Sequence, residues 1–195
     1  MRVITGVARG RRLKTLEGMD TRPTTDRVKE GLFNIIQFDL PACRFLDLFA
    51  GSGQIGIEAL SRGAEYAVFI DQNRDALQII KENLLTTGLL KKARAVSMEA
   101  KTYLQSVKVP FDIVFLDPPY HQGILPEILP LVAQKTTPTG MIICEHEKNE
   151  ELPAEICNFH LKKQYRYGKI MLSVYKTPDE EGIDSHEDSR VSGEF

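Results

Sequence analysis

The sequence has few cysteines, no long hydrophobic run and no internal repeat in its 195 residues. Cys43, Cys144 and Cys157 are odd in number and lack the spacing of metal ligands, so we expect free thiols and no bound metal. No apolar run reaches the ~20 residues that a membrane-spanning helix needs, and the N-terminus lacks the apolar segment of a signal peptide. These absences argue against a disulfide-stabilised secreted domain and a membrane protein. They predict a cytoplasmic protein with no membrane partner.

Acidic and basic residues are unevenly distributed, although the formal net charge is only −2. Residues 177–195 carry a charge of −6, which leaves about +4 for residues 1–176. The acidic segment has few apolar residues, and we expect it to be disordered. The first 14 residues contain no acid and these five bases: Arg2, Arg9, Arg11, Arg12 and Lys14. A basic arm of this kind suits contacts with phosphates, although a solvated hairpin can also be basic.

Apolar segments alternate with amphipathic ones from residue 44 onward. Strands are expected over 45–49, 66–70, 93–98, 111–116 and 141–144, and helices over 74–86, 100–107 and 124–134, with a further helix of about ten residues that ends at Gly63. Two strands joined at Gly168 close the pattern, and residues 2–16 predict another hairpin. Such alternation predicts an α/β fold with a mostly parallel sheet, helices on both faces and an antiparallel end.

The most distinctive motif is Asp117-Pro118-Pro119-Tyr120, which follows the apolar strand over 111–116. Pro118 has no backbone N–H and keeps Asp117 extended, so the strand ends at the sheet edge where α/β proteins bind ligands. The Asp117 carboxylate and the Pro118 carbonyl can accept the two N–H groups of an exocyclic amine, and the Tyr120 ring can stack on a base. A proline turn would explain Asp-Pro alone. The full tetrapeptide predicts a catalytic set of Asp117, Pro118, Pro119 and Tyr120.

A second motif, Gly51-Ser-Gly53-Gln-Ile-Gly56, lies between a strand and a helix, with Asp71 20 residues after Gly51. This matches the dinucleotide fingerprint, in which the acid binds ribose hydroxyls. Asp47 discriminates between cofactors, because its carboxylate would repel a pyrophosphate but suits the ammonium and sulfonium groups of S-adenosylmethionine. The predicted cofactor contacts are Asp47, Phe49, Gly51, Ser52, Gly53, Asp71, Gln72, Glu99 and Ala100. Capping or loop roles remain open for the acids, and a helix start for Glu99 and Ala100.

Because Asp47-Leu-Phe-Ala-Gly-Ser-Gly53 is followed by Asp117-Pro-Pro-Tyr120, the sequence resembles class I S-adenosylmethionine-dependent methyltransferases that modify exocyclic amines. More narrowly, it resembles the bacterial RsmD family, which methylates N2 of a guanine in 16S ribosomal RNA. That likeness extends over about residues 1–176. Its opening signature comprises Ile4-Thr-Gly6, Gly10-Arg-Arg-Leu13, Thr21-Arg22-Pro23-Thr24, Asp26-Arg-Val-Lys-Glu30 and Leu32-Phe-Asn34.

The resemblance implies a Rossmann-like class I methyltransferase fold with a seven-stranded sheet and an antiparallel C-terminal hairpin strand. It implies an N-terminal basic hairpin and helix over 1–40, a methyltransferase domain over 41–176 and an acidic tail over 177–195. The implied acceptor is the guanine usually numbered 966, in 16S rRNA, the small subunit or an assembly intermediate. The implied RNA contacts are Arg9, Arg11, Arg12, Lys14 and Arg22. We expect a monomer.

Three other functions remain open. A DNA adenine-N6 methyltransferase uses the same Asp-Pro-Pro-Tyr chemistry, but this sequence has no insertion large enough for a target-recognition domain. A nicotinamide-dependent oxidoreductase would explain the glycines and Asp71, but neither Asp47 nor Asp117–Tyr120. A catalytically silent RNA-binding protein is disfavoured only because every motif residue is present. His121 has no assigned role.

Overall fold

The computed structural model describes residues 1–16, 26–120 and 122–178. Arg22, His121 and the acidic segment from residue 179 onward, on which some of the predictions rest, lie outside the described residues. The helices are α1 (Asp26–Ile36), α2 (Gln54–Ser61), α3 (Arg74–Thr87), α4 (Ala100–Ser106) and α5 (Ile124–Gln134), with a 3-10 turn over Leu90–Lys92. The strands are β1 (Arg44–Leu48), β2 (Tyr66–Asp71), β3 (Ala93–Ser97), β4 (Phe111–Leu116), β5 (Thr136–Glu147), β6 (Glu155–Ile156), β7 (Phe159–Tyr167) and β8 (Ile170–Lys176).

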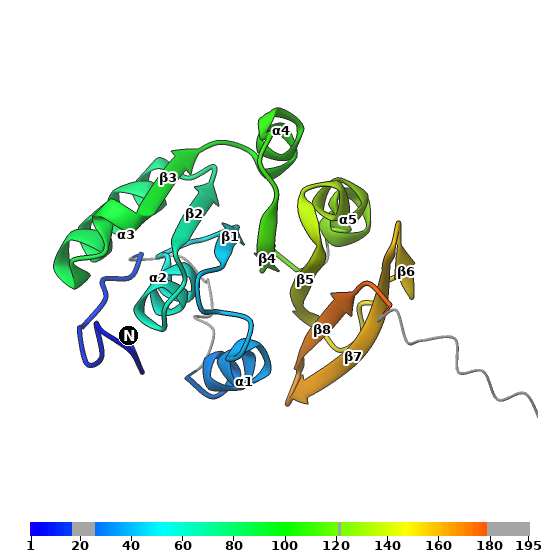
Figure 1. Cartoon of the computed structure of the whole chain (residues 1–195), viewed down its shortest axis with the longest axis horizontal. Coiled ribbons are helices and arrows are strands. Elements are labelled where there is room, and N and C mark those ends of the chain that lie inside the picture. Colours follow the sequence, from blue (N-terminus) through cyan, green and yellow to red (C-terminus); the bar gives the residue numbers. More distant parts are fainter. Residues whose placement is uncertain (17–25, 121, 179–195) are drawn as a thin grey trace, which may run out of the picture.

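The described strands form one sheet in the order β3-β2-β1-β4-β5-β8-β7-β6 (Figure 1). The strands from β3 to β5 in this order are parallel, β8 is antiparallel to β5, and β7 is antiparallel to β8. The predicted α/β fold with an antiparallel end is confirmed. The predicted number of seven strands is wrong by one, because β6 pairs with β7 over only two residues, too few to give an alternating pattern.

Helices cover both faces of the sheet, and each face has its own hydrophobic cluster. Buried residues of α1, α2 and α3 pack on one face, and buried residues of α4 and α5 pack on the other (Figure 1). The parallel strands are apolar at nearly every position because both of their faces are buried. Within β1, Phe45 points to the first cluster and Leu46 to the second, so the alternation of the strand assigns each side chain to a face.

Local signals fix the ends of the helices. The Asn73 side chain accepts a hydrogen bond from Asp75 N at 2.8 Å and begins α3, which ends at Gly88 in the left-handed conformation (φ 74°). The predicted helices over 74–86, 100–107 and 124–134 are confirmed to within one residue. Helical spacing of apolar residues therefore located these elements correctly.

The two predicted N-terminal strands do not form as such, but residues 1–3 and 11–13 do lie antiparallel, with Val3 N donating to the carbonyl of Arg11 at 2.9 Å and Leu13 N to that of Met1 at 3.0 Å. Within the described N-terminal segment only one antiparallel bridge forms, between Arg2 and Arg12. The backbone N–H groups of Ile4 and Thr5 instead donate to the two carboxylate oxygens of Glu58 on α2, at 2.8 and 2.9 Å. A backbone N–H that bonds to a side chain is not available for a strand ladder. Residues 1–16 therefore form a segment bound to α2, which we call the N-terminal arm.

Glu58 is the centre of a buried ionic network that joins the N-terminal arm to two helices. Its carboxylate lies 3.5 Å from Nζ of Lys29 on α1, and Nε of Arg62 donates to it at 2.8 Å. Lys29 Nζ also donates to the carbonyl of Arg2 at 2.8 Å. The Lys29 and Glu58 side chains are fully buried, and burial lowers the pKa of Lys29 although Glu58 opposes this shift.

The domain boundaries that the sequence predicts at residues 40 and 176 stay predictions.

Candidate functional site

Four carboxylates lie near the carboxyl ends of four adjacent strands. Asp71 ends β2, Asp47 lies in β1, Asp117 follows β4, and Glu145 lies in β5. The chain runs from β1 outward through β2 to β3, and then crosses back to β4 on the other side of β1. The carboxyl ends of β1 and β4 therefore form the topological switch point of the sheet. In open α/β sheets the ligand crevice lies outside the carboxyl ends of the strands at that point. The residues of the two predicted motifs are therefore brought to the expected place.

Asp47 is buried, with 2% of its surface exposed. Its Oδ2 atom accepts a hydrogen bond from the backbone N–H of Gly56 at 2.9 Å, which ties β1 to the first turn of α2. Burial raises the pKa of Asp47 to about 7, the Gly56 hydrogen bond opposes the rise, and Asp71 adds to it. A buried carboxyl group with a raised pKa favours a cationic ligand, because positive charge nearby stabilises the ionised form.

The glycine loop has the left-handed conformations that the motif requires. Gly51 and Gly53 have φ values of 53° and 76°, and Phe49 has a φ of 66° without being a glycine. A Cβ atom built on Gly51 would meet nothing within 4 Å, so this part of the loop borders open space. At Gly56 a Cβ atom would lie 2.3 Å from the ring of Phe69 on β2. The third glycine thus allows α2 to approach the sheet closely.

Asp71 and Asn83 hold the glycine loop from outside. Asp71 Oδ2 accepts from Gly51 N at 2.8 Å, and its Oδ1 accepts from Asn73 N at 2.8 Å. Asn83 on α3 donates from Nδ2 to the carbonyl of Ser52 at 2.9 Å and exchanges hydrogen bonds with the backbone of Lys14 in the N-terminal arm. One side-chain amide therefore links the loop to the arm.

The remaining predicted cofactor residues differ in their positions. Gln72 is exposed after β2, and Ala100 is buried at the start of α4. Glu99 is the N-cap of α4, and its carboxylate accepts from the backbone N–H groups of Lys101 and Thr102 at 2.9 and 2.7 Å. Burial by itself would raise the pKa of Glu99, but these hydrogen bonds outweigh it and the pKa is lowered. The structure thus gives Glu99 a capping role, and its contact with a cofactor stays a prediction.

The Asp117–Tyr120 segment places its polar groups beside a second acid. Asp117 is half-buried, and burial, then Glu145, then Asp47 raise its pKa well above the usual range. Pro118 is buried and Pro119 is exposed. The Tyr120 hydroxyl donates to Oε1 of Glu145 at 3.3 Å. Burial, Asp117 and Glu145 together raise the pKa of Tyr120.

Glu145 is a site residue that the sequence analysis missed. It is 3% exposed, although the predicted strand stopped at Cys144. The strand in fact continues to Glu147, and Glu145 follows Met141 and Ile143 on the same face of β5. The sequence Met-Ile-Ile-Cys-Glu-His-Glu over 141–147 has no alternation of apolar and polar residues, so it gave no signal that this acid faces inward.

The carboxylates of the site fit S-adenosylmethionine. Those of Asp47 and Asp71 suit its ammonium and sulfonium groups and its ribose hydroxyls, whereas they would repel a pyrophosphate. In the described part of the chain, no group of three or more His, Cys, Asp or Glu side chains is placed to hold a metal ion.

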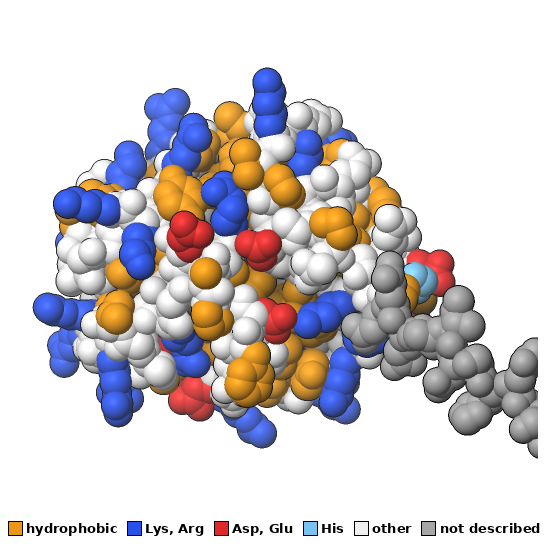
Figure 2. Space-filling model, viewed as in Figure 1, with side chains coloured by type: hydrophobic (Ala, Val, Ile, Leu, Met, Phe, Trp, Pro, Cys, Tyr) orange, Lys and Arg blue, Asp and Glu red, His pale blue; other side chains and the backbone are white. Residues whose placement is uncertain are grey.

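The predicted RNA-binding residues of the N-terminal arm reach the surface. Arg9, Arg11, Arg12 and Lys14 are exposed, and Lys14 Nζ lies 2.6 Å from a carboxylate oxygen of Glu82 on α3. Figure 2 shows one face of the molecule, on which Lys and Arg side chains surround a few central acids. This distribution matches the positive balance of residues 1–176.

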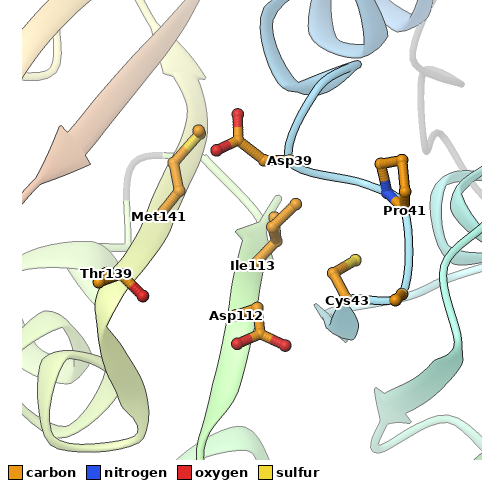
Figure 3. Close-up of a pocket in the computed structure, with 8 residues that line it drawn as sticks. Asp39, Pro41, Cys43, Asp112, Ile113, Thr139 and Met141 are labelled. Carbon is orange, nitrogen blue, oxygen red and sulfur yellow. The ribbon is translucent and has the colours of Figure 1, made fainter.

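A pocket of about 320 Å³ lies at the opposite end of the sheet (Figure 3). Asp39, Pro41 and Cys43 approach it from the segment before β1, and Asp112 from the start of β4. Asp112 accepts from the backbone N–H of Arg44 at 2.8 Å, and Asp39 accepts from Lys176 Nζ at 3.3 Å. None of the predicted site residues lines this pocket. Asp112 thus holds the beginning of β1, and Asp39 holds the end of β8.

No helix in residues 1–16, 26–120 and 122–178 is long and apolar enough to cross a bilayer.

Comparison with known proteins places residues 1–176 in one family. The family model described as "Conserved hypothetical protein 95" matches this whole range. YlbH of Bacillus subtilis is 41% identical over 181 residues, covering 90% of this chain and 98% of that protein. Ribosomal RNA small subunit methyltransferase D of Escherichia coli is 37% identical over 178 residues, covering 90% of this chain and 89% of that protein.

Solved structures agree with these sequence matches. The Escherichia coli protein yhhF superposes with a TM-score of 0.82 at 36% identity, covering 91% of this chain and 97% of that one. The hypothetical protein TTHA0928 of Thermus thermophilus gives a TM-score of 0.78 at 29% identity, covering 91% and 99%. The chain belongs to the Conserved hypothetical protein 95 (RsmD) family of S-adenosylmethionine-dependent methyltransferases.

Proposed function

We propose that this protein transfers a methyl group from S-adenosylmethionine to the exocyclic N2 amine of one guanine in 16S ribosomal RNA. The observation that carries the proposal is the position of Asp117-Pro118-Pro119-Tyr120 at the carboxyl end of β4, beside Asp47 on β1. The relatives from Escherichia coli and Haemophilus influenzae, which are 37% and 35% identical, are named ribosomal RNA small subunit methyltransferase D. These names support small-subunit RNA as the substrate, and the family resemblance adds the guanine usually numbered 966 as the target.

The guanine amine is a weak nucleophile, because its lone pair is shared with the ring. In the proposed mechanism, Asp117 and the Pro118 carbonyl accept its two N–H groups and localise the lone pair on nitrogen. When bound, S-adenosylmethionine supplies the electrophilic methyl group and a positive charge beside the carboxylates. Asp117 is then ionised despite its burial, and it stabilises the positive charge that develops on N2. The N2 lone pair forms the new bond to the methyl carbon as the carbon–sulfur bond breaks, and the acidic N2 proton then passes to the Asp117 carboxylate that already accepts it. Most of the rate enhancement comes from alignment for this in-line attack.

The N-terminal arm is the proposed RNA contact. Exposed Arg9, Arg11 and Arg12 suit phosphates, and Arg22 is assigned the same role by resemblance. The arm is small, so we expect the RNA fold or the small subunit to present the target base, as is typical of RNA recognition. Residues 1–40 are proposed to cover the cofactor as well, because Asn83 bonds both the arm and the glycine loop.

Methyl transfer from labelled S-adenosylmethionine tests this function. The acceptors are duplex DNA, protein-free 16S RNA and small subunits from cells that lack the protein, and the product nucleoside is identified by mass. We expect N2-methylguanine at one RNA position. N6-methyladenine in DNA would instead support the competing DNA methyltransferase, and no transfer to any acceptor would contradict both.

Asp117→Ala tests the division of roles within the site. We expect at least a hundredfold loss of kcat with cofactor affinity within threefold of wild type, because Asp117 is assigned to the base. The control is Asp39→Ala, which removes an acid at the opposite end of the sheet and should retain activity. An equal loss of activity and cofactor binding in Asp117→Ala would refute the assignment.

A further inference from the structure

Four acids lie near the carboxyl ends of β2, β1, β4 and β5, and Glu145 is the one to which no ligand group has been assigned. Its side chain is almost fully buried, with 3% of its surface exposed, and Asp117 is its neighbour. Two acids side by side in a partly buried place are concentrated at functional sites. Asp117 and Glu145 together can offer adjacent hydrogen-bond acceptors to a ligand.

The pairing of β4 with β5 places the two acids next to each other across neighbouring strands. Leu116 pairs with Cys144 in parallel register, so Asp117 and Glu145 each come one residue later on neighbouring strands. Neighbouring strands lie about 4.8 Å apart. The Tyr120 hydroxyl donates to Glu145 at 3.3 Å. The ring that is predicted to stack on the base therefore lies beside Glu145. Two carboxylates and one aromatic ring thus border the same space.

The edge of guanine that carries the amine matches this arrangement. It presents two N–H groups at N2 and a further N–H at the adjacent N1, whereas adenine presents an acceptor at N1. Asp117 and the Pro118 carbonyl use the two N2 hydrogens in the proposed mechanism, so the N1 hydrogen needs another acceptor.

We infer that Glu145 accepts the N1–H of the target guanine and so selects guanine over purines that lack this hydrogen. The inference rests on the proposed function. Sites that hydrogen-bond a substrate N–H reject analogues without it strongly, because an acceptor nitrogen in place of the N–H loses that hydrogen bond and faces a carboxylate oxygen instead. Glu145 is thus a specificity residue, whereas Asp117 acts on the reacting amine.

The test compares two acceptors that both carry a 2-amino group. The RNA that the wild-type protein methylates is prepared with guanine or with 2,6-diaminopurine at the target position, since diaminopurine has no N1–H. We expect wild type to prefer guanine at least a hundredfold in kcat/KM. In Glu145→Gln the preference should fall below tenfold, because an amide can donate to N1 as well as accept from it. Glu145→Asp, which keeps the acid, should retain most of the preference at a lower rate.

Two controls separate the inference from its rivals. S-adenosylhomocysteine titration and thermal melting show that each variant is folded and binds cofactor normally. Tyr120→Phe removes the hydroxyl that donates to Glu145 but keeps the ring, and it should slow both acceptors equally.

An equal fall on both acceptors in Glu145→Gln would overturn the inference, as would a loss of preference in Tyr120→Phe that matches that of Glu145→Gln. If wild type methylates no guanine at all, the proposed function is refuted, and the inference about Glu145 is refuted with it. If wild type methylates guanine without a preference, only the role of Glu145 fails.

Discussion

Single buried carboxyl groups set the balance between stability and binding in this protein. Asp47 is buried where it can meet a positively charged ligand, and burial raises its pKa from an ordinary value of 3.8 to about 7. A group whose pKa is raised in the folded state binds a proton more tightly when folded. Asp47 therefore lowers the free energy of unfolding progressively as the pH rises from about 3.8 to about 7, after which its effect is constant.

Asp47→Asn should stabilise the ligand-free protein at the expense of cofactor binding. The asparagine keeps an oxygen that can accept from Gly56 N but carries no charge. We expect a gain in unfolding free energy of up to about 4 kcal/mol at pH 8, since each pKa unit corresponds to roughly 1.4 kcal/mol, and a smaller gain at pH 5. Urea unfolding at the two pH values measures this. Calorimetry should show at least tenfold weaker binding of S-adenosylmethionine, and an equal gain at both pH values would contradict the explanation.

The sequence predicts some residues of the site better than others. Asp47 and Asp117 were assigned from their places in motifs, and the structure brings both to the switch point of the sheet. Glu145 was missed because its partner is set by strand register, which the sequence does not display. The left-handed backbone of Phe49 is similarly invisible, since nothing in a phenylalanine signals a φ of 66°. This conformation costs about 1–2 kcal/mol, and the surrounding loop must maintain it.

At the scale of elements, α2 joins the glycine loop to the N-terminal arm. The glycine loop leads into its first turn, and the N-terminal arm bonds to Glu58 and Ser61 near its end. The buried network of Glu58 is costly to disturb, because removing one partner leaves an unpaired buried charge on Lys29.

Glu58→Gln should release the N-terminal arm from α2. We expect a loss of about 3–5 kcal/mol in unfolding free energy, together with faster amide hydrogen exchange at residues 3–8. The matched control is Glu82→Gln, which removes the partner of Lys14 at an exposed position and should change stability far less. Comparable losses in the two variants would show that burial of the network is unimportant.

Elements that depend on local patterns were predicted well, and elements that depend on distant partners were not. The helices α3, α4 and α5 have their capping residues and apolar spacing within their own sequences. The N-terminal strands were predicted too long, because Ile4 bonds to a carboxylate 54 residues away and does not extend the pairing of Val3 with Arg11. The strand β6 was missed because its two residues form a strand only through pairing with β7.

At the scale of the whole molecule, negative and positive side chains lie in different places. Carboxylates line the site at the switch point, whereas Arg9, Arg11 and Arg12 are exposed on the N-terminal arm. An acidic site bound to a basic arm suits a cationic cofactor beside a polyanionic acceptor.

Replacing Arg9, Arg11 and Arg12 together by alanine should weaken RNA binding at least tenfold near 0.1 M salt and leave cofactor affinity unchanged. The slope of log affinity against log salt should become shallower by roughly 0.7–0.9 for each phosphate that the variant no longer neutralises. Filter binding across a salt series measures both. The control is a triple alanine replacement of the exposed residues Lys162, Lys163 and Lys169, with the same change in charge. Equal weakening in the control would mean that only net charge matters.

The bonds between the N-terminal arm and Glu58 also have a consequence for synthesis. Residues 4 and 5 emerge from the ribosome long before residue 58, and the separation of 54 residues corresponds to roughly 3–11 seconds at about 5–20 residues per second. During that interval the carboxylate that will bind their N–H groups has not yet left the ribosome. The arm therefore spends seconds as a free cationic peptide beside the ribosome that is making it, and takes its native place only after α2 has been made.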